Sequence, residues 1–396
     1  MPETADVVVI GAGVVGCATA YFLAKEGMRV CLMEREAVGS GASAHGHGVL
    51  SLVGKDFNRG PHFLLGLAGK RMYPEFIAGL MEESGVDPLY HERTGLSLAL
   101  VDEEERIFRE AMAWQKYYVD LKWIDGDEVR RLEPRVTPAA IGAVMYDHGQ
   151  VDAYRLCLAM ATAIERRGGS LLLRQATGLK AGSDRVTGVL YPGGEVECGA
   201  AVIAAGAWSG VASQWLHFPV PVRPLKGEVL HARLESDPVR VFILTARHGP
   251  ILPRKDGVLL IGSTGGVSMS GMDVDAKHVF DPADQGPWDF DSRPTEEARR
   301  FILERVLAIM PALENAQVTG HLAGVRPLCA DRMPLIGPVP GWRGAYLATG
   351  HGTKGIHLAP ITGRIVADQI TRGETEVPVP MDAFSPARFA PGRGGA

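Results

Sequence analysis

The first 34 residues constrain the fold more than any other part of the sequence. The apolar run 7–10 predicts a buried parallel strand, because such a strand is apolar on both faces. A glycine-rich turn follows, then a helix that ends at Gly27 and a second strand, 29–33, which is followed by Glu34. A strand, turn, helix and strand in this order, closed by an acidic residue, is typical of a unit that binds a dinucleotide.

The turn has the spacing Gly11-x-Gly13-x-x-Gly16, and each glycine has a physical task. Gly11 permits the tight turn, Gly13 lets the backbone approach a pyrophosphate, and Gly16 lets the helix pack closely on the strand. The N-terminus of the helix offers N–H groups and a positive dipole end to the same pyrophosphate. Glu34 would accept hydrogen bonds from the ribose hydroxyls. NAD and FAD both use this unit, so other features must distinguish them.

Length and charge limit what the rest of the chain can be. A chain of 396 residues predicts two domains, at about 100–200 residues per domain. The 46% of hydrophobic and 22% of charged residues are typical of a folded protein rather than a disordered one. The net charge of -5, with both signs interspersed, provides no basic stripe for a nucleic acid. We therefore expect a small-molecule partner and no nucleic acid.

Cysteine usage and the lack of long apolar runs indicate the setting of the protein. The cysteines are odd in number, scattered and without a C-x-x-C pair, so we expect neither a disulfide framework nor a metal site. No cationic leader precedes the first strand, and no apolar run approaches the roughly 18 residues of a transmembrane helix. We expect a cytoplasmic protein, with peripheral attachment to the inner membrane and assembly into homo- or hetero-oligomers left open. The five cysteines are Cys17, Cys31, Cys157, Cys198 and Cys329.

The rest of the chain contains elements of two kinds. Apolar periodicity predicts helices over 62–84, 103–118 and 154–167, and short apolar runs predict strands over 96–101, 171–173 and 201–206 with a hairpin over 185–196. Strand-like segments at 226–233, 241–245 and 257–264 predict an antiparallel sheet, separate from the parallel strands of the dinucleotide unit.

Residues 266–294 carry six aspartates among glycines and prolines. The plainer interpretation is a solvated surface loop, and the sharper one is a lid over an active site. The spacing does not match a calcium-binding loop. The six are Asp273, Asp275, Asp281, Asp284, Asp289 and Asp291.

Three further features point to a ligand that lies against open backbone. The glycine-rich stretch 350–355 precedes an apolar helix that we expect to begin near Pro360, since proline fits a first helical turn. The strand 201–206 ends in small residues beside Trp208, which leaves room for a bulky cofactor. Arg326, between small residues and a proline, is suited to clamp a carboxylate through two parallel hydrogen bonds, unless a structural ion pair holds it.

Together these residues resemble the glycine/D-amino acid oxidase family of flavoproteins. The resemblance extends from residue 7 to about 370, is nearest in layout to the glycine oxidase members, and implies FAD as the cofactor. It implies an α/β fold in which a Rossmann-like FAD-binding domain is interleaved with an antiparallel-sheet substrate domain of α+β type. The FAD-binding domain would use 1–87, 146–215 and 320–396, and the substrate domain 88–145 and 216–319.

The resemblance also implies residue roles. Arg326 would hold the carboxylate of the substrate, while His351 and Lys354 would stabilise negative charge on the reduced ring, although both are equally well explained as ordinary loop residues. His45 falls where some members bond a histidine covalently to the flavin, and an unlinked polar contact is the alternative. The residues expected to contact FAD are Gly11, Gly13, Val14, Val15, Gly16, Glu34, Arg35, Ala42, Ser43, His45, His47, Gly48, Val49, Thr177, Gly206, Gly350, His351, Gly352, Thr353, Lys354, Gly355 and Ile356.

The implied activity is oxidation of the CH–NH bond of a small or N-substituted amino acid to an imine, with oxygen or another carrier as electron acceptor. Two positions depart from the glycine oxidase pattern: Pro250 replaces a substrate-binding tyrosine and Thr353 replaces a second arginine. Both departures speak against glycine itself as the substrate. The alternatives are a flavoprotein that oxidises a 2-hydroxy acid, and the flavin subunit of a hetero-oligomeric dehydrogenase.

Overall fold

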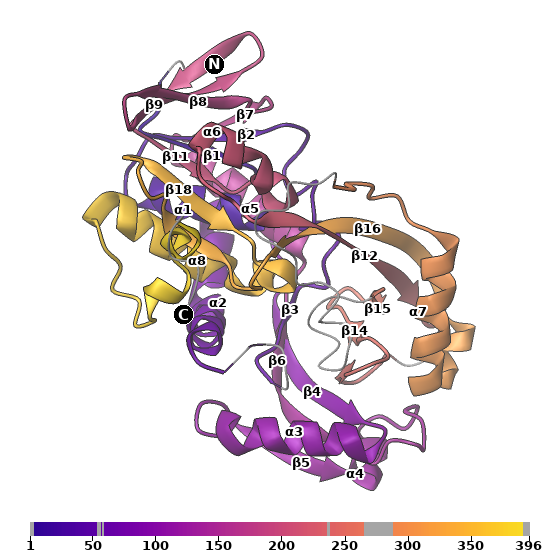
Figure 1. Ribbon diagram of the computed structural model, residues 1–396. Coiled ribbons are helices and arrows are strands. Elements are labelled where there is room, and N and C mark those ends of the chain that lie inside the picture. The colour runs from indigo at the N-terminus through magenta and orange to yellow at the C-terminus, as the bar shows by residue number, and fades with distance from the viewer. Residues whose placement is uncertain (1–3, 54–56, 58, 236–237, 265–287, 391–396) are drawn as a thin grey trace.

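Two large sheets are joined by two long strands, and a small three-stranded sheet accompanies them. The computed structural model describes residues 4–53, 57, 59–235, 238–264 and 288–390. The paired strands β12 (Val222–Arg233) and β16 (Gln317–Cys329) run from the region of the first sheet into the second (Figure 1). A cleft between the two sheets would therefore have these strands in its wall.

The first sheet is the predicted dinucleotide-binding sheet. Its neighbouring strands are parallel except β17 and β18 at one edge, so the Rossmann-like half of the predicted fold is confirmed. In spatial order the strands are β17 (Leu335–Pro338), β18 (Ala345–Thr349), β11 (Ala200–Ile203), β1 (Val7–Ile10), β2 (Val30–Glu34) and β7 (Ser170–Leu173).

Side chains of β1 alternate between two hydrophobic cores. Val7 and Val9 pack among helices, while Val8 and Ile10 pack toward a small antiparallel sheet on the other face. This burial on both faces is the reason that the strand is wholly apolar. The helices are α1 (Val14–Lys25), α2 (Pro61–Ser84), α5 (Ala153–Arg166) and α8 (Gly355–Arg372), and the small sheet is β8 (Gly178–Gly182), β9 (Arg185–Tyr191) and β10 (Gly194–Glu197).

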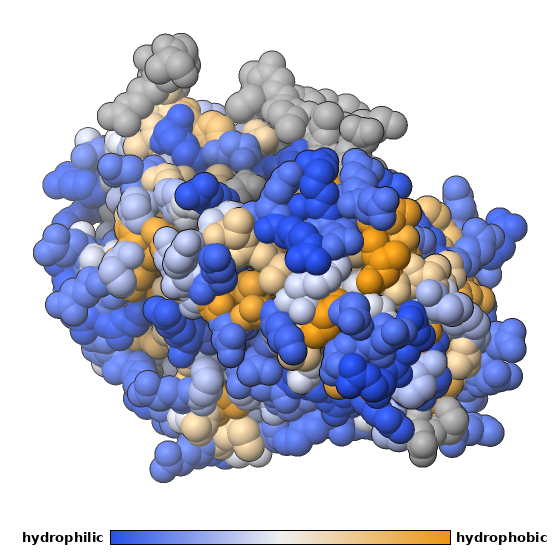
Figure 2. Space-filling view, turned by 90° about the horizontal axis from the view of Figure 1, so that it is seen from below, coloured by the Kyte–Doolittle hydropathy of each residue, from blue (hydrophilic) through white to orange (hydrophobic). Residues whose placement is uncertain are grey.

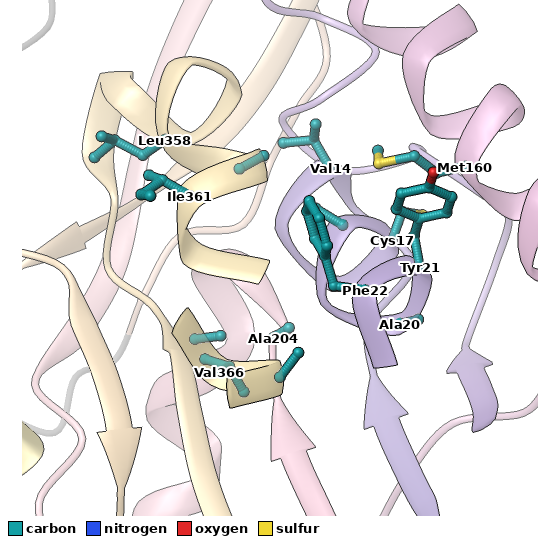
Figure 3. Close-up of a cluster of buried hydrophobic side chains, with 14 of the residues drawn as sticks. Val14, Cys17, Ala20, Tyr21, Phe22, Met160, Ala204, Leu358, Ile361 and Val366 are labelled. Atoms are coloured by element: carbon teal, nitrogen blue, oxygen red, sulfur yellow. The ribbon is translucent and has the colours of Figure 1, made fainter. Parts of the chain in front are cut away.

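Helix α1 lies between two of these helices. Figure 3 shows its residues Val14 and Phe22 on the side of Leu358 and Ile361 from α8, with Met160 of α5 beside Tyr21. Burying one such side chain contributes about 1.5–3 kcal/mol to folding. The packing fixes the N-terminus of α1 against the end of β1, where the glycine turn lies.

The start of α8 differs from the sequence-based prediction. The helix begins at Gly355, and Pro360 lies inside it rather than near its first turn. A proline inside a helix has no N–H for the carbonyl four residues earlier, which here belongs to Ile356. The buried Tyr73 of α2 donates its hydroxyl to that carbonyl. A partner from another helix thus supplies the missing hydrogen bond, which sequence periodicity cannot reveal.

The second sheet is larger and mixed. All of its ladders are antiparallel except the one between β13 and β4, so the predicted antiparallel sheet has one parallel pair. In order the strands are β16, β12, β15 (Leu259–Ile261), β14 (Ile251–Pro253), β13 (Phe242–Thr245), β4 (His91–Ala99), β6 (Gly142–Gln150) and β3 (Val49–Leu50), and β5 (Leu121–Asp125) pairs with β6.

The remaining helices are short or flank the second sheet. They are α3 (Asp102–Gln115), α4 (Gly126–Leu132), α6 (Ser213–Leu216) and α7 (Glu296–Ile309), with 3-10 helices η1 (Gly206–Ala212), η3 (Pro311–Asn315), η4 (Gly352–Lys354), η5 (Met381–Ala383) and η6 (Pro386–Phe389). The strand predicted over 201–206 ends at Ile203, and η1 starts at Gly206, whose φ is 54°.

The expected domain boundaries can be located on this architecture. Those at 146 and 320 fall inside β6 and β16, both of which belong to the second sheet, so the division into two domains remains a proposal.

Most of the aspartate-rich segment, residues 265–287, lies outside the described residues. The two interpretations of that segment, a surface loop and a lid, therefore concern residues that the structure does not describe.

The surface and the cysteines have ordinary features. Hydrophilic residues predominate on the face shown in Figure 2, and the hydrophobic ones form small separate groups. All five cysteines are buried free thiols. Within the described ranges, none of the helices combines the length and the apolar character needed to cross a bilayer.

Candidate active site

A long cavity lies at the carboxyl ends of the parallel strands. Gly11 follows β1, Glu34 ends β2, Ala204 follows β11 and Thr349 ends β18, and all four line it. Its empty space is about 1370 Å³ with the open mouth included. The chain continues from β1 to β2 on one side while β11 lies on the other, and such a switch point is where open α/β sheets bind ligands.

The three glycines of the turn have different surroundings. A Cβ on Gly11, whose φ is 107°, would lie 2.5 Å from the carbonyl oxygen of Ala204, and one on Gly16 would lie 1.8 Å from that of Gly11. Packing within the protein therefore requires both, and Gly16 lies behind the cavity wall. A Cβ on Gly13 would approach nothing in the protein closer than 3.4 Å, to Ser43 Oγ. The small residue at 13 leaves space for a ligand at the N-terminus of α1.

Glu34 is held in place by backbone donors. Its Oε2 accepts the N–H of Ala12 at 2.8 Å and its Oε1 accepts that of Glu36 at 3.0 Å. A carboxylate oxygen can accept more than one hydrogen bond, so both keep capacity for ribose hydroxyls. Ser43 Oγ accepts the N–H of Val14 at 2.9 Å and so ties the 39–48 loop to the first turn of α1.

An aromatic and cationic stack forms one wall of the cavity. The guanidinium of Arg35 lies 3.8 Å from the ring centroid of Trp208, and that ring stacks on Phe290 at 5.2 Å with an interplanar angle of 15°. Arg35 is one of the predicted contacts. The role of Trp208 as a wall residue agrees with the expectation that a cofactor lies beside the end of β11.

The segment that follows β7 reaches the long cavity just before the predicted contact Thr177. Arg174, Gln175 and Ala176 line the long cavity, whereas Thr177 lies outside its wall as described. The amide and the hydroxyl of Thr177 both donate to the carbonyl of Leu190, at 2.8 and 3.3 Å. The position directly after a parallel strand is the signal that would have found the three residues.

The glycine-rich segment after β18 forms the opposite end of the cavity. His351, Gly352, Thr353, Gly355 and Ile356 line it, in agreement with expectation. Gly350 does not, because it serves a turn: its φ is 78° and a Cβ there would lie 3.0 Å from that of Cys329.

His351 is buried, and its chemistry differs from the expected one. Its Nε2 pairs with Thr362 Oγ1 at 3.0 Å, and burial lowers its pKa to about 3. The ring is therefore neutral near pH 7 and would contribute a hydrogen bond rather than a positive charge. Lys354 is half-buried, with Nζ 5.3 Å from the centroid of Phe57, and is the cation of this segment.

A side cavity adjoins the long one. The two share wall residues, and the second sheet completes the side cavity with Gly227, Leu244, Thr245, Pro250, Ser263 and Gly324. The described residues that line it include no aspartate or glutamate. The shared residues are Ala42, Gly46, Arg326, Thr353 and Ile356, and the predicted contacts found only in the side cavity are His45, His47, Gly48, Val49 and Lys354.

Arg326 lies on β16 at the junction of both cavities. Its guanidinium packs on Gly227 of β12, where an added Cβ would lie 2.3 Å from Cζ, and its Nη2 donates to Ser263 Oγ at 3.1 Å. Burial lowers its pKa to about 10, so it stays protonated at neutral pH. A desolvated guanidinium at a cavity wall is suited to bind a carboxylate.

Two histidines of the 39–48 loop face the side cavity. Nδ1 of His45 donates to the carbonyl of Gly41 at 2.7 Å, and the ring packs against Gly324 of β16. Nε2 of His47 donates to the carbonyl of Gly262 at 2.6 Å. In the described part of the chain, no three His, Cys, Asp or Glu residues are grouped so that they could hold a metal ion.

Comparison with known proteins agrees with this geometry. A family model described as FAD dependent oxidoreductase matches residues 6–369. A glycine oxidase of Pseudomonas aeruginosa is 32% identical over 390 residues, which cover 97% of this chain and 98% of that protein. The hydrogen cyanide synthase subunit HcnC of the same species is 29% identical, with coverage of 99% and 98%. The crystal structure of glycine oxidase from Geobacillus kaustophilus matches with a TM-score of 0.88 at 29% identity and covers 97% of this chain and 99% of that chain.

Proposed function

Because the chain belongs to the FAD-dependent oxidoreductase family, we propose that it oxidises the CH–NH bond of a small amino acid or N-substituted amino acid to an imine. The glycine oxidases among its relatives support an amino acid as the substrate. The residues of the long cavity fit FAD: Gly13 leaves space at the helix N-terminus for a pyrophosphate, and the carboxylate of Glu34 is fixed at the wall for a ribose.

The position of Arg326 carries this proposal. It is a half-buried cation on the wall common to the cofactor cavity and the side cavity, and no acidic residue lines the described part of the side cavity. A substrate whose carboxylate binds Arg326 would place its α-carbon at the junction of the two cavities. The residues that hold the substrate then also orient its C–H bond toward the cofactor.

The chemistry divides between cofactor and protein. Bound FAD supplies the acceptor for the hydride equivalent that leaves the carbon bearing the amine. The chain binds the carboxylate through Arg326, and the apolar side chains of Leu244 and Ile356 displace water from the reacting carbon. Lys354, beside the same cavity, adds positive charge where negative charge increases during the reaction.

The lining also limits the substrate. Pro250 and Thr353, the two departures from the glycine oxidase pattern, both line the side cavity. Neither supplies a cationic or phenolic group for a carboxylate, and Val49 and Leu244 add apolar surface. We therefore propose a substrate with a small apolar substituent on the α-carbon or on the nitrogen, in preference to glycine.

A substrate panel tests the proposed function. Glycine, sarcosine, D-alanine and D-proline are each offered in parallel with glycolate and lactate, and both hydrogen peroxide and reduction of an artificial dye are measured. We expect turnover of at least one substituted amino acid and none of the hydroxy acids. Peroxide formation indicates an oxidase, and dye reduction without peroxide a dehydrogenase. Turnover of hydroxy acids alone would replace the proposal with the alternative activity.

We also propose that FAD is held without a covalent bond. His45, the residue at the position of the link in some family members, uses Nδ1 for the Gly41 carbonyl and packs against β16. Acid precipitation of the purified protein should leave the yellow colour in the supernatant. Colour retained in the pellet, and lost in His45→Ala, would establish the covalent link instead.

A further inference from the structure

His47 has a defined proton arrangement that the proposed function does not use. A carbonyl oxygen can only accept a hydrogen bond, so the 2.6 Å contact with the Gly262 carbonyl requires the proton on Nε2. Burial, followed by the nearby charge of Arg326, lowers the pKa of His47 to about 4, so a second proton is not bound near pH 7. The ring is thus neutral, and Nδ1 carries a lone pair.

That lone pair is directed to the side cavity. His47 lines the cavity and is only half-buried. Among the described residues, the Gly262 carbonyl is the one hydrogen-bond partner of its ring, and Nδ1 is not among the buried atoms that lack a partner. The exposed part of the ring therefore includes Nδ1.

The polar groups near His47 in the side cavity are mainly donors, so an acceptor at Nδ1 of His47 adds a function that they lack. Arg326 and Lys354 can only donate, Ser263 Oγ already accepts from Arg326 at 3.1 Å, and Thr245 Oγ1 accepts the N–H of His248 at 2.8 Å. The carboxylate of an α-amino acid can accept hydrogen bonds from these donors, whereas its amine brings N–H groups that need an acceptor. The amine and the carboxylate are bonded to the same carbon, so that acceptor must lie near Arg326. His47 meets this requirement because it lines the same side cavity as Arg326.

We propose that Nδ1 of His47 accepts a hydrogen bond from the amine of the substrate while Arg326 holds its carboxylate. The inference rests on the proposed function and adds a residue that determines specificity for amines. The hydroxyl of a 2-hydroxy acid is also a donor, but it has a single hydrogen that is free to rotate. In an amine, the N–H that His47 binds fixes the direction of the nitrogen lone pair. His47 accepts a hydrogen bond throughout and takes no proton.

Three variants separate the two nitrogens of the ring. His47→Asn keeps an acceptor near the position of Nδ1, His47→Gln keeps a donor near the position of Nε2 for the Gly262 carbonyl, and His47→Met keeps neither. The holoenzyme is titrated with acetate and with propionate, which have a carboxylate but no amine, and binding is followed by the change in flavin absorption. KM is measured for the amino acid with the highest turnover in the panel.

We expect His47→Met and His47→Gln to raise KM for the amino acid by about tenfold, because one lost hydrogen bond to a charged or strongly polar group usually has an effect of this size. The Kd of acetate should change less than twofold in both variants. His47→Asn should retain most of the affinity. An equal loss for acetate and the amino acid would mean that the ring only shapes the cavity, and an unchanged KM in His47→Met would remove the contact. Either result overturns the inference, whereas failure of the wild-type protein to oxidise any amine overturns the proposed function.

Discussion

Arg326 is the residue on which the proposed substrate class depends most. Replacing it with alanine removes a charge-assisted hydrogen bond pair worth about 1.5–3 kcal/mol, so kcat/KM for a carboxylate substrate should fall by about 10- to 100-fold. Arg326→Lys keeps the charge but not the two parallel donors, and an intermediate loss is expected. Steady-state kinetics of both variants with the best amino acid of the panel measure the effect.

Arg343 provides a matched control for this prediction. It is an exposed arginine paired with Asp184 at 2.7 Å, and it lines neither cavity. Arg343→Ala should leave kcat/KM unchanged. If Arg326→Ala behaves in the same way, Arg326 does not bind the substrate.

At the level of single residues, the sequence predicted positions better than protonation states. Gly11, Gly13 and Glu34 lie where the motif requires, because a short stretch of chain determines their relative geometry. His351 also lies at the wall, but its burial and its hydrogen bond to Thr362 depend on α8. The sequence therefore could not predict that the ring is neutral and carries no positive charge for the cofactor. The tautomer of His47 likewise depends on Gly262, a residue more than 200 positions away.

At the level of elements, the pairing of β12 with β16 positions Arg326. Gly227 lies opposite Gly324 in that ladder, and its missing side chain provides the surface on which the guanidinium rests. Gly227→Ala should displace the guanidinium and lower kcat/KM by about tenfold or more, since the new methyl group would lie 2.3 Å from Cζ without movement.

Gly320→Ala on β16 controls for the general effect of filling a strand glycine. A Cβ there would lie 3.5 Å from that of His231, an ordinary contact, so activity should remain. Equal activity of the two variants would show that the packing of Arg326 on Gly227 does not determine its position.

Helix α8 depends on a hydrogen bond from another helix. Tyr73→Phe removes the donor to the Ile356 carbonyl and should reduce the free energy of unfolding by about 1–3 kcal/mol, the effect of leaving a buried acceptor unsatisfied. Because Ile356 also lines both cavities, FAD should dissociate more readily from this variant. Denaturant unfolding and the dissociation of FAD measure the two effects.

Pro360→Ala makes this prediction specific. The new N–H can donate to the same carbonyl within the helix, so Tyr73→Phe should cost less in the Pro360→Ala background than in the wild-type protein. An equal cost in both backgrounds would mean that Tyr73 stabilises the protein through its ring contacts with Phe76 and Tyr90 instead.

Elements with strong local signals were predicted well, and those set by tertiary contacts were not. Helix α2 was predicted within one residue of its bounds, because its apolar periodicity is continuous. Helix α8 was predicted to start five residues too late, because the proline rule takes no account of Tyr73. The parallel ladder of β13 and β4 had no local signal at all, since strand pairing is a property of the whole sheet.

At the scale of the whole molecule, the chain repeatedly crosses between the two sheets, and this is what assembles the site. The 39–48 loop leaves the first sheet and enters β3 of the second, while β16 returns toward the first. The long cavity follows from the motif, but the side cavity needs residues from β12, β13 and the 262–263 region that no sequence pattern brings together. The residues that flank Arg326 and the resemblance to a family both pointed to this arginine, whereas only the fold supplies Gly227, Ser263 and Gly262.

Histidines whose pKa is lowered by desolvation should make the stability of the protein depend on pH. Burial lowers the pKa of His47 and His62 to about 4 and that of His351 and His357 to about 3, and lowers that of His148 well below its usual range. In the unfolded chain each has a pKa near 6.5, so below that pH the unfolded state binds more protons than the folded one. Stability is therefore complete above about pH 6.5 and decreases as the pH falls toward 4, by up to about 1.4 kcal/mol per pH unit for each histidine.

His62→Gln tests whether these side chains carry the effect. The free energy of unfolding of the holoprotein is measured by denaturant titration between pH 7.5 and 5, and the variant should show a slope shallower by about 1.4 kcal/mol per pH unit below pH 6, because one titrating group is gone. His217→Asn is the control, since His217 is exposed in the left-handed region at a φ of 47°, which asparagine tolerates. The comparison uses slopes, so a variant that is less stable at every pH still gives an answer. Equal slopes in all three proteins would mean that acidic groups rather than buried histidines govern the acid side of the stability profile.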